Sequence, residues 1–530
     1  MANRELFRTL VGALMPVADG RNEEGAPAYR LTPRQALAQY AATGCLNATF
    51  YADAEAQLDR VLALCAEVDT TFVARTAIYC RERGHMKDMP ALLLAVVSRR
   101  DPALFDRVFD RVIDSPRMLR TFVQIVRSGA TGRKSLGSAP KRCVRRWLNQ
   151  RTDAAVFAAS VGNAPSLADV LRMVHPKPET RAREALYRYL LDRPADENDL
   201  PAIVRQFERF KAGDRAAVPE VPFQMLTALP LDARDWAAIA ARSSWQTTRM
   251  NLNTFARHGV FDVPGMTVRI AERLRDRAEI ARAKAFPYQL LAAIRSAGDE
   301  VPRMVAGALE DALELAIASV PAVEGKVYVC PDVSGSMRTP ITGRRKGATT
   351  AVRCVDVAAL MAAAVLRRNP AAEVLPFEQT VIGLRMSARD SVLTNAERLA
   401  AVGGGGTSVS APLALLNRRK AKGDLVIVVS DNESWVDAGS ARGTATLQEW
   451  NTFRARNRNA RLVLIDLQPY GTTQAMQRAD ILNVGGFSDE VFETISAFAR
   501  GRLHGDHWVD AIDAIAMQDA SVATGRSSGR

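Results

Sequence analysis

Apolar residues recur at three- and four-residue spacing through most of the first 320 positions, which is the pattern of helices that bury one face. Segments 54–66, 71–83 and 89–99 show this spacing clearly, and short polar stretches separate them. Thr32 followed by Pro33 marks a helix start, because a threonine hydroxyl caps the first turn and proline suits its first position. Because no strict period is present, the pattern predicts a degenerate array of helical repeats.

The pattern changes after residue 320, where short apolar runs alternate with helical segments. Such alternation predicts a mostly parallel, doubly wound α/β sheet. Two of the runs, 373–378 and 380–386, are too close for a crossover helix, so an antiparallel edge hairpin is expected there. The expected strands are 326–331, 373–378, 380–386, 425–430, 461–467 and 480–484, and the expected helices are 352–368, 390–400, 409–419, 444–457 and 488–500.

Oxygen-bearing side chains follow two of these strands and a run of glycines at 403–406. Ligands of parallel sheets bind at the carboxyl ends of strands, so these side chains are expected to converge. Two carboxylates with three hydroxyls suit Mg²⁺ or another hard divalent ion. Such an ion either completes a binding position for an anionic partner or only pins three loops together. The candidate metal ligands are Asp332, Ser334, Ser336, Thr407 and Asp431.

Composition narrows the possible partners and compartments. The chain carries 71 Lys and Arg against 58 Asp and Glu, a formal net charge of +13, which favours polyanionic partners. No segment approaches the roughly 20 continuous apolar residues of a membrane span, and the amino terminus lacks the apolar core of a signal peptide. The 6 cysteines are scattered without a Cys-x-x-Cys pair. A cytoplasmic, reduced protein without a membrane partner is therefore expected.

The segment 125–151 gives the strongest signal for nucleic acid, because it contains many basic residues and no acidic one. Its glycines predict a flexible loop that leads into a basic helix, an arrangement that follows phosphates without reading bases. Trp147 either stacks on a base or anchors that helix in the core. A solvated basic face is the alternative for the whole segment. The candidate phosphate contacts are Arg127, Arg133, Lys134, Lys141, Arg142, Arg145 and Arg146.

Several motifs carry a resemblance to a known family. The order Asp-x-Ser-x-Ser, threonine, strand-ending aspartate resembles the metal-ion-dependent adhesion site of von Willebrand factor A domains. Segments 171–178, 249–261 and 286–291 resemble signatures of the TROVE module. A TROVE module followed by a von Willebrand factor A domain is the architecture of the Ro family, and residues 430–435 also look like that family. The resemblance covers about residues 20–515 and divides the chain into a TROVE module at 1–320, a von Willebrand factor A domain at 321–515 and a frayed tail at 516–530.

The resemblance implies a HEAT-like helical ring closed by the α/β domain. It implies small structured Y-type RNA on the outer surface, single-stranded ends of misfolded RNA in the hole, and a role in noncoding-RNA quality control, sometimes beside an exoribonuclease. His175 and Lys177 join the candidate RNA contacts on this ground, whereas Arg257, His258 and Glu433 have open roles. A histidine that animal Ro proteins carry upstream is absent from 165–169, so its contact cannot be carried over.

Two functions from different classes fit these observations. The first is a monomeric, non-enzymatic RNA-binding protein of the Ro type. The second is a metal-dependent adaptor for an ATPase or nuclease complex, whose partner places an acidic residue at the metal. Catalysis is not expected, because the chain has no Ser-His-Asp order, no Gly-Lys-Ser/Thr phosphate loop after 403–406 and no second metal site.

Overall fold

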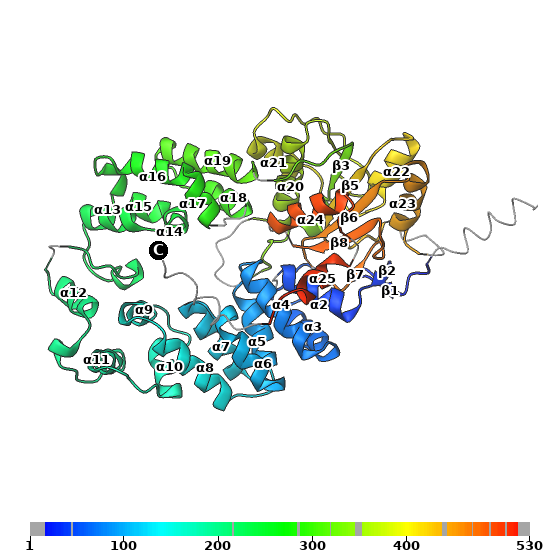
Figure 1. Cartoon of the computed structure of the whole chain (residues 1–530). Coiled ribbons are helices and arrows are strands. Elements are labelled where there is room, and N and C mark those ends of the chain that lie inside the picture. Colours follow the sequence, from blue (N-terminus) through cyan, green and yellow to red (C-terminus); the bar gives the residue numbers. More distant parts are fainter. Residues whose placement is uncertain are drawn as a thin grey trace, which may run out of the picture. The chain divides into compact units, whose positions relative to one another are not determined.

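The computed structural model describes residues 16–43, 46–214, 217–283, 287–318, 320–344, 352–436, 443–468, 470–486, 489–503 and 506–517 (Figure 1). Cys45, Phe286, Arg345, Lys346 and the tail from 518 onward lie outside the described residues. By its contacts the chain divides into two compact units. The first unit holds Met1–Glu67, Lys284–Arg295 and Glu310–Asp513, and the second holds Val68–Ala283, Ser296–Leu309 and Ala514–Arg530. The boundary predicted at residue 320 separates two modules along the sequence. The contacts divide the chain differently, because they group segments from both sides of residue 320 in the first unit.

A five-stranded sheet forms the centre of the first unit, with the order β4-β3-β5-β6-β8 and every neighbouring pair parallel. This order confirms the doubly wound α/β fold predicted from the alternation of apolar runs and helices. Five of the six predicted strands are present, and four of them match closely. Their bounds are Val327–Pro331 (β3), Glu373–Val374 (β4), Leu425–Ser430 (β5), Arg461–Asp466 (β6) and Ile481–Gly485 (β8).

Helices cover both faces of this sheet, which is why its central strands are apolar throughout. Alternate strand residues such as Tyr328, Val426 and Leu462 share one buried cluster with Leu413 and Trp450, which lie on α22 and α23. Figure 1 shows α20 and α21 beside the sheet, apart from α22 and α23. The bounds are Cys354–Arg368 (α20), Val392–Ala400 (α21), Ala411–Arg418 (α22), Ala445–Arg456 (α23) and Asp489–Ala499 (α24).

The predicted antiparallel hairpin at the sheet edge is wrong. The edge strand β4 has only two residues and pairs parallel with β3. The run 380–386 is not a strand; what remains of the hairpin is an antiparallel bridge between Phe377 and Val381 and a 2.7 Å hydrogen bond from the Ile382 N–H to the carbonyl of Pro376. The physical reason is that residues 381–386 are at most half-buried, so little apolar burial holds a second strand of the hairpin against the edge of the sheet.

The amino-terminal segment also differs from its prediction, because residues 1–320 are not helical throughout. Strands β1 (Gly20–Arg21), β2 (Pro27–Arg30) and β7 (Thr472–Thr473) form a second, antiparallel sheet. Helix α2 (Pro33–Thr43), whose start at Pro33 was predicted, contacts β8 and α25 (His507–Asp513). These long-range pairings place the first 67 residues in the same unit as the α/β sheet.

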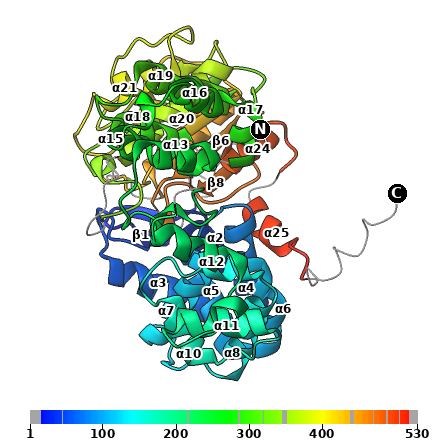
Figure 2. The same cartoon turned by 90° about the vertical axis from the view of Figure 1, so that its left-hand side faces the viewer.

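The second unit is helical, as predicted, and neighbouring helices such as α4, α5 and α6 pack on one another (Figure 2). Side-chain caps start many of them: Asp69, Asp101 and Ser115 each accept a backbone N–H of the first turn. The bounds are Thr70–Glu82 (α4), Asp88–Arg100 (α5), Pro102–Val112 (α6), Pro116–Ser128 (α7), Ser138–Asn149 (α8), Asp153–Ala158 (α9), Leu167–Val174 (α10), Arg181–Leu190 (α11), Ala202–Lys211 (α12), Ala233–Arg242 (α13), Trp245–Met250 (α14), Leu252–Arg257 (α15), Met266–Arg275 (α16) and Arg277–Ala283 (α17).

The remaining helices are α3 (Ala54–Glu67), α18 (Pro287–Ser296) and α19 (Arg303–Ile317), and short 3-10 turns include η2 (Phe223–Met225) and η4 (Ser336–Arg338). Within the described ranges, none of the helices combines the length and apolar character needed to cross a membrane. The described cysteines are all buried, and no disulfide joins any of them within the described residues.

Candidate metal centre and nucleic-acid interface

The candidate metal centre lies at the carboxyl ends of β3 and β5, which are neighbours in the sheet. Asp332 follows β3, and Asp431 follows β5. The backbone N–H of Asp332 donates to Val429 of β5 over 2.9 Å, which ties the two strand ends together. The sheet therefore brings both predicted carboxylates to one edge, as the rule for parallel sheets requires.

Hydroxyl groups surround Asp332. Its Oδ1 accepts the backbone N–H of Ser334 over 2.8 Å, and its Oδ2 accepts the hydroxyl of Ser430 over 2.5 Å. The hydroxyl oxygens of Ser334 and Ser336 lie 3.4 Å apart, and Ser336 hydrogen-bonds Asp431. Ser430 is a contact that sequence reasoning missed, although it is the last residue of the predicted strand.

The glycine loop carrying Thr407 packs against the Asp-x-Ser-x-Ser loop. Gly335 donates its N–H to the carbonyl of Gly405 over 2.8 Å. Gly403 has φ +81°, and a Cβ there would lie 2.3 Å from the carbonyl oxygen of Val333, so this close approach requires glycine. The carbonyl of Thr407 accepts the N–H groups of residues 435 and 436, which holds Thr407 buried beside the strand ends. All five predicted ligands are thus buried in three loops that contact one another.

The electrostatics of this site favour a cation. Burial and the neighbouring charge of Asp431 raise the pKa of Asp332 to about 7. Burial also raises the pKa of Asp431, although the hydrogen bond from Ser336 offsets part of that effect. Neither carboxylate forms an ion pair within the described part of the chain. Two buried, adjacent carboxylates with nearby hydroxyls fit a hard divalent ion, which would remove their mutual repulsion.

Hydroxyl groups outnumber carboxylates among the candidate metal ligands, so the site is not a cluster of charged side chains. Among the described residues, no group of three or more His, Cys, Asp or Glu side chains is placed to hold a metal ion. The candidate centre therefore depends on hydroxyl ligands from Ser334, Ser336 and Thr407 in addition to its two carboxylates. Weakly charged oxygen sites of this kind suit Mg²⁺ or Mn²⁺ better than softer metals.

Residues from the amino-terminal segment border the centre, which sequence reasoning missed. Glu433 is buried, and its Oε2 accepts the backbone N–H of Glu23 over 2.8 Å; burial and the charge of Asp431 raise its pKa to about 9. The side chain of Asn22 donates to the carbonyl of Ser434 over 2.7 Å. Glu433, whose role the sequence left open, therefore holds the segment around Glu23 beside the candidate metal centre.

A fourth buried acid, Asp466, ends β6 next to this site. Burial and the charges of Glu433 and Asp431 raise its pKa well above the usual value, and Asn432 donates to it. The available signal was its position, because Asp466 ends a predicted apolar strand just as Asp431 follows one. Sequence reasoning passed over it because no hydroxyl motif accompanies it.

The candidate nucleic-acid interface lies in the second unit, on α8 and the loop that precedes it. Arg127 and Lys134 are exposed, Lys141 is half-buried, and none of the three forms an ion pair within the described residues. Arg133 is engaged in the fold, since its guanidinium donates to the Ser98 hydroxyl over 2.6 Å. Arg145 donates to the carbonyl of Val174.

Two predicted contacts, Arg142 and Arg146, meet acidic residues from a neighbouring helix. Arg142 pairs with Asp106 over 2.7 Å, and Arg146 pairs with both Asp106 and Asp110 of α6. Burial alone would raise the pKa of Asp106, but hydrogen bonds from Arg146 and Arg142 lower it to about 2. Although the segment 125–151 contains no acidic residue, acidic side chains of α6 lie beside its arginines in the folded protein.

Trp147 is a core residue. It is 1% exposed, and its indole N–H donates to the carbonyl of Ile113 over 2.8 Å. This geometry confirms the interpretation of Trp147 as the apolar anchor of α8 and leaves no open face for a base. The guanidinium of Arg151 lies 4.7 Å from its ring centre.

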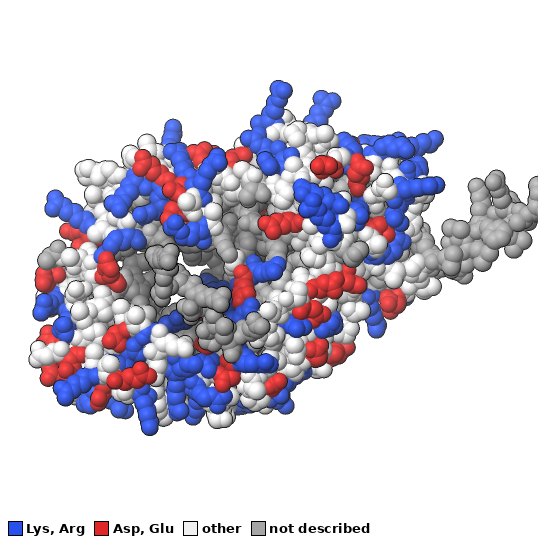
Figure 3. All heavy atoms as spheres, viewed as in Figure 1, with Lys and Arg blue, Asp and Glu red and all other residues white. Residues whose placement is uncertain are grey.

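His175 and Lys177 are exposed just after α10, which packs on α8. Because Arg145 bonds to Val174, the last residue of α10, the structure brings these two predicted contacts near the basic helix. Arg257 and His258 end α15, and the His258 ring stacks on Trp236 with 4.3 Å between centroids. Figure 3 shows positive and negative side chains interspersed on the face in view, without one continuous basic block.

Comparisons with known proteins agree with the architecture. Residues 326–499 match a family model described as the Ro60 vWA domain. The chain is 26% identical to the RNA-binding protein RO60 of Deinococcus radiodurans, in an alignment that covers 91% of this chain and 96% of that protein. The crystal structure of the Deinococcus radiodurans Ro (Rsr) protein is similar with a TM-score of 0.59 and 23% identity, covering 89% of this chain and 100% of that one. These findings confirm the resemblance inferred from the sequence motifs.

Proposed function

Given that residues 326–499 carry the von Willebrand factor A domain of Ro proteins and that the resemblance to Ro extends along most of the chain, we propose that this protein binds RNA without transforming it. The observation that carries the proposal is the similarity to an RNA-binding protein over 91% of the chain. The ligands we propose are small structured Y-type RNA on the helical module and single-stranded ends of misfolded RNA. The role we propose is noncoding-RNA quality control by a monomeric, cytoplasmic protein.

Cations without an ion pair among the described residues of the second unit support this proposal. Arg127, Lys134, Lys141 and Lys177 have no ion pair within the described residues, so phosphates can contact them without displacing an acid. Contacts of this kind position an RNA backbone and carry no base preference by themselves. Sequence preference must then come from RNA shape or from another part of the chain.

The direct test is to purify the protein from its own cells without nuclease and to sequence the RNA that accompanies it. Enrichment of one small structured RNA is the expected result. A preparation that is free of RNA even at low salt would contradict the proposal. Incubation of labelled single-stranded RNA with Mg²⁺ tests the non-enzymatic part, because cleavage that Asp332→Ala abolishes would overturn it.

The candidate metal centre would be held by Asp332, Ser334, Ser336, Thr407 and Asp431. A bound divalent ion, for which Mg²⁺ is our candidate, would offer an open coordination position to an anionic ligand. The carboxylates supply charge to hold it, and the buried loops exclude competing water.

An exposed apolar rim beside this centre supports a second role as a protein adaptor. Trp435 is 43% exposed and packs so closely on the glycine loop that a Cβ on Gly406 would lie 2.6 Å from its ring. Val436 beside it is 41% exposed. Exposed aromatic and aliphatic side chains next to a charged site are typical of protein interfaces. We propose a partner, for example an exoribonuclease, that places an acidic residue at the metal. Its binding is expected to need Mg²⁺ and to be lost in Asp332→Ala.

The pairing of Arg142 and Arg146 with Asp106 leads to a further prediction. In Asp106→Asn, Arg142 loses its charged partner and becomes available to phosphates, whereas Arg146 keeps its ion pair with Asp110. RNA affinity is expected to rise about fivefold, as for one charge pair near a protein surface. The free energy of unfolding is expected to fall by only about 1 kcal/mol, because these side chains are partly exposed and screened. Filter binding and thermal unfolding measure the two effects. Unchanged RNA affinity would mean that these arginines stabilise the fold and do not contact RNA.

A further inference from the structure

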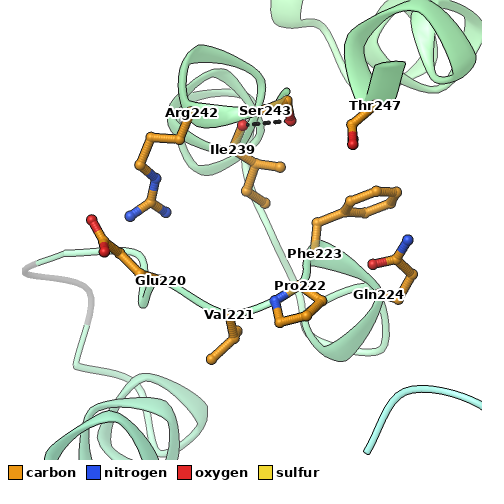
Figure 4. A pocket seen from close by; sticks show the side chains of 9 residues that line it. All are labelled: Glu220, Val221, Pro222, Phe223, Gln224, Ile239, Arg242, Ser243 and Thr247. Atoms are coloured by element: carbon orange, nitrogen blue, oxygen red, sulfur yellow. Dashed lines mark hydrogen bonds between the residues drawn. The ribbon is translucent and has the colours of Figure 1, made fainter. Parts of the chain in front are cut away.

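A cavity of about 550 Å³ opens in the second unit between η2, α13 and α14 (Figure 4). Its volume lies within the usual range of small-ligand pockets. One part of its wall is apolar and comes from Val221, Pro222, Phe223 and Ile239. None of these residues belongs to the predicted RNA contacts or to the metal centre, and the motifs that carry the Ro resemblance do not include them.

The aromatic part of the wall is held in place by the core. The Phe223 ring packs on Trp236 with 6.2 Å between centroids and 58° between ring planes. Trp236 is buried, and the ring of His258 stacks on it. A supported ring beside aliphatic side chains offers a contact surface for a flat, apolar ring system.

A carboxylate and a guanidinium occupy the opposite side of the cavity. Figure 4 shows the Glu220 carboxylate and the Arg242 guanidinium close together and directed toward each other, away from Phe223 and Gln224. The two do not form an ion pair. Arg242 is instead oriented by the backbone, since it donates to the carbonyls of Val218 over 2.9 Å and Pro219 over 3.4 Å. Three of its five N–H donors remain for a ligand.

This pair of charges discriminates among flat ligands. A carboxylate accepts two adjacent N–H donors, and a guanidinium donates to two adjacent acceptors. Guanine presents both sets on one ring system, with N1–H and the N2 amino group as donors and O6 and N7 as acceptors. Adenine presents no pair of adjacent donors for the carboxylate. A phosphate group is disfavoured at this position, because Glu220 would repel it.

We propose that this cavity binds a guanine base, with Glu220 accepting from N1–H and the N2 amino group, Arg242 donating to the acceptor edge, and the base lying against Phe223. The base comes either from single-stranded RNA or from a free guanine nucleotide, and the RNA source rests on the proposed function. Gln224 and Thr247 line the rim on the Phe223 side and are placed to contact the sugar.

Isothermal titration of the full-length protein with guanosine, inosine and adenosine monophosphates tests the proposal. Inosine lacks only the N2 amino group, so its affinity is expected to be about tenfold lower than that of guanosine monophosphate. Adenosine monophosphate is expected to bind weaker still. In Glu220→Gln the amide replaces one acceptor by a donor, and the preference for guanosine over adenosine monophosphate is expected to disappear. Glu197→Gln, the same change at an exposed site outside the cavity, is expected to keep that preference.

Equal binding of the three nucleotides, or wild-type guanosine monophosphate affinity in Glu220→Gln, would overturn the guanine site. A short oligouridine with one central guanosine, compared with plain oligouridine, then separates the sources. A gain in affinity that Glu220→Gln removes identifies RNA as the source, whereas binding of the mononucleotide alone identifies a free nucleotide. Failure of the guanine site leaves binding of structured RNA intact, so the two proposals fail in different experiments.

Discussion

Replacing Arg127, Lys134 and Lys141 together by alanine is expected to weaken the binding of a structured RNA by on the order of 100-fold at about 0.1 M salt. These three cations have no acidic partner within the described residues, so phosphates can contact them without displacing an acid. Each lost phosphate contact removes the release of about one counterion. The slope of log affinity against log salt is therefore expected to become shallower by about 2 to 3, which filter binding at several salt concentrations measures.

A matched variant separates this surface from net charge. Arg209, Arg234 and Arg303 are exposed residues of the second unit on other helices, and their replacement by alanine removes the same charge. That triple variant is expected to change the affinity only slightly. If both triple variants lose affinity equally, the RNA responds to the overall charge and the assigned surface is wrong.

The second large effect is expected at Asp332. Burial and Asp431 raise its pKa to about 7 in the folded protein, whereas an exposed aspartate has a pKa of about 4. Between about pH 4 and pH 7 the folded state therefore binds more protons than the unfolded state, so the free energy of unfolding of the metal-free protein falls as pH rises. The difference between the two pKa values corresponds to a loss on the order of a few kcal/mol by neutral pH.

A divalent ion is expected to restore this loss, because it neutralises the two buried carboxylates. The increase in unfolding temperature on adding Mg²⁺ should therefore grow from about pH 5 to about pH 8. Asp332→Asn removes the titrating group: at neutral pH without metal it should be more stable than the wild type, and it should respond little to Mg²⁺. Calorimetry with and without a chelator measures both. If Mg²⁺ does not stabilise the wild-type protein at any pH, the proposal of a metal centre at these residues is wrong.

Asp114→Asn is a suitable control for these measurements. This aspartate pairs with Arg81 in the second unit, and its side chain is 45% exposed. Loss of such a pair costs little, about 1 kcal/mol or less. The variant is therefore expected to keep the wild-type response to Mg²⁺ and pH.

The fold class and the meeting of the candidate ligand residues at one edge of the sheet could be predicted from the sequence because local patterns encode them. Apolar runs such as β5 and the helical spacing of α3, α4 and α5 depend on neighbours along the chain, and the structure places these elements within one or two residues of the prediction. Asp332 and Asp431 could be paired in advance, since parallel strands bring their carboxyl ends to one edge. The hairpin at 373–386 was inferred from two neighbouring apolar runs alone, and this prediction was wrong because 380–386 is not a strand.

Only the tertiary structure decided which distant segments and side chains contact these elements. The pairing of β2 with β7 and the contact of Glu433 with Glu23 join segments more than 400 residues apart, and no periodicity reports such contacts. The same holds for the charges on α8, because Asp106 neutralises arginines that stand 36 and 40 residues away in the chain. The sequence by itself thus determined which segments are helices and strands, which residues are candidate ligands and which cations are candidate contacts. The fold determined which charges stay free, since burial and ion pairing depend on neighbours in space, whereas periodicity depends on neighbours along the chain.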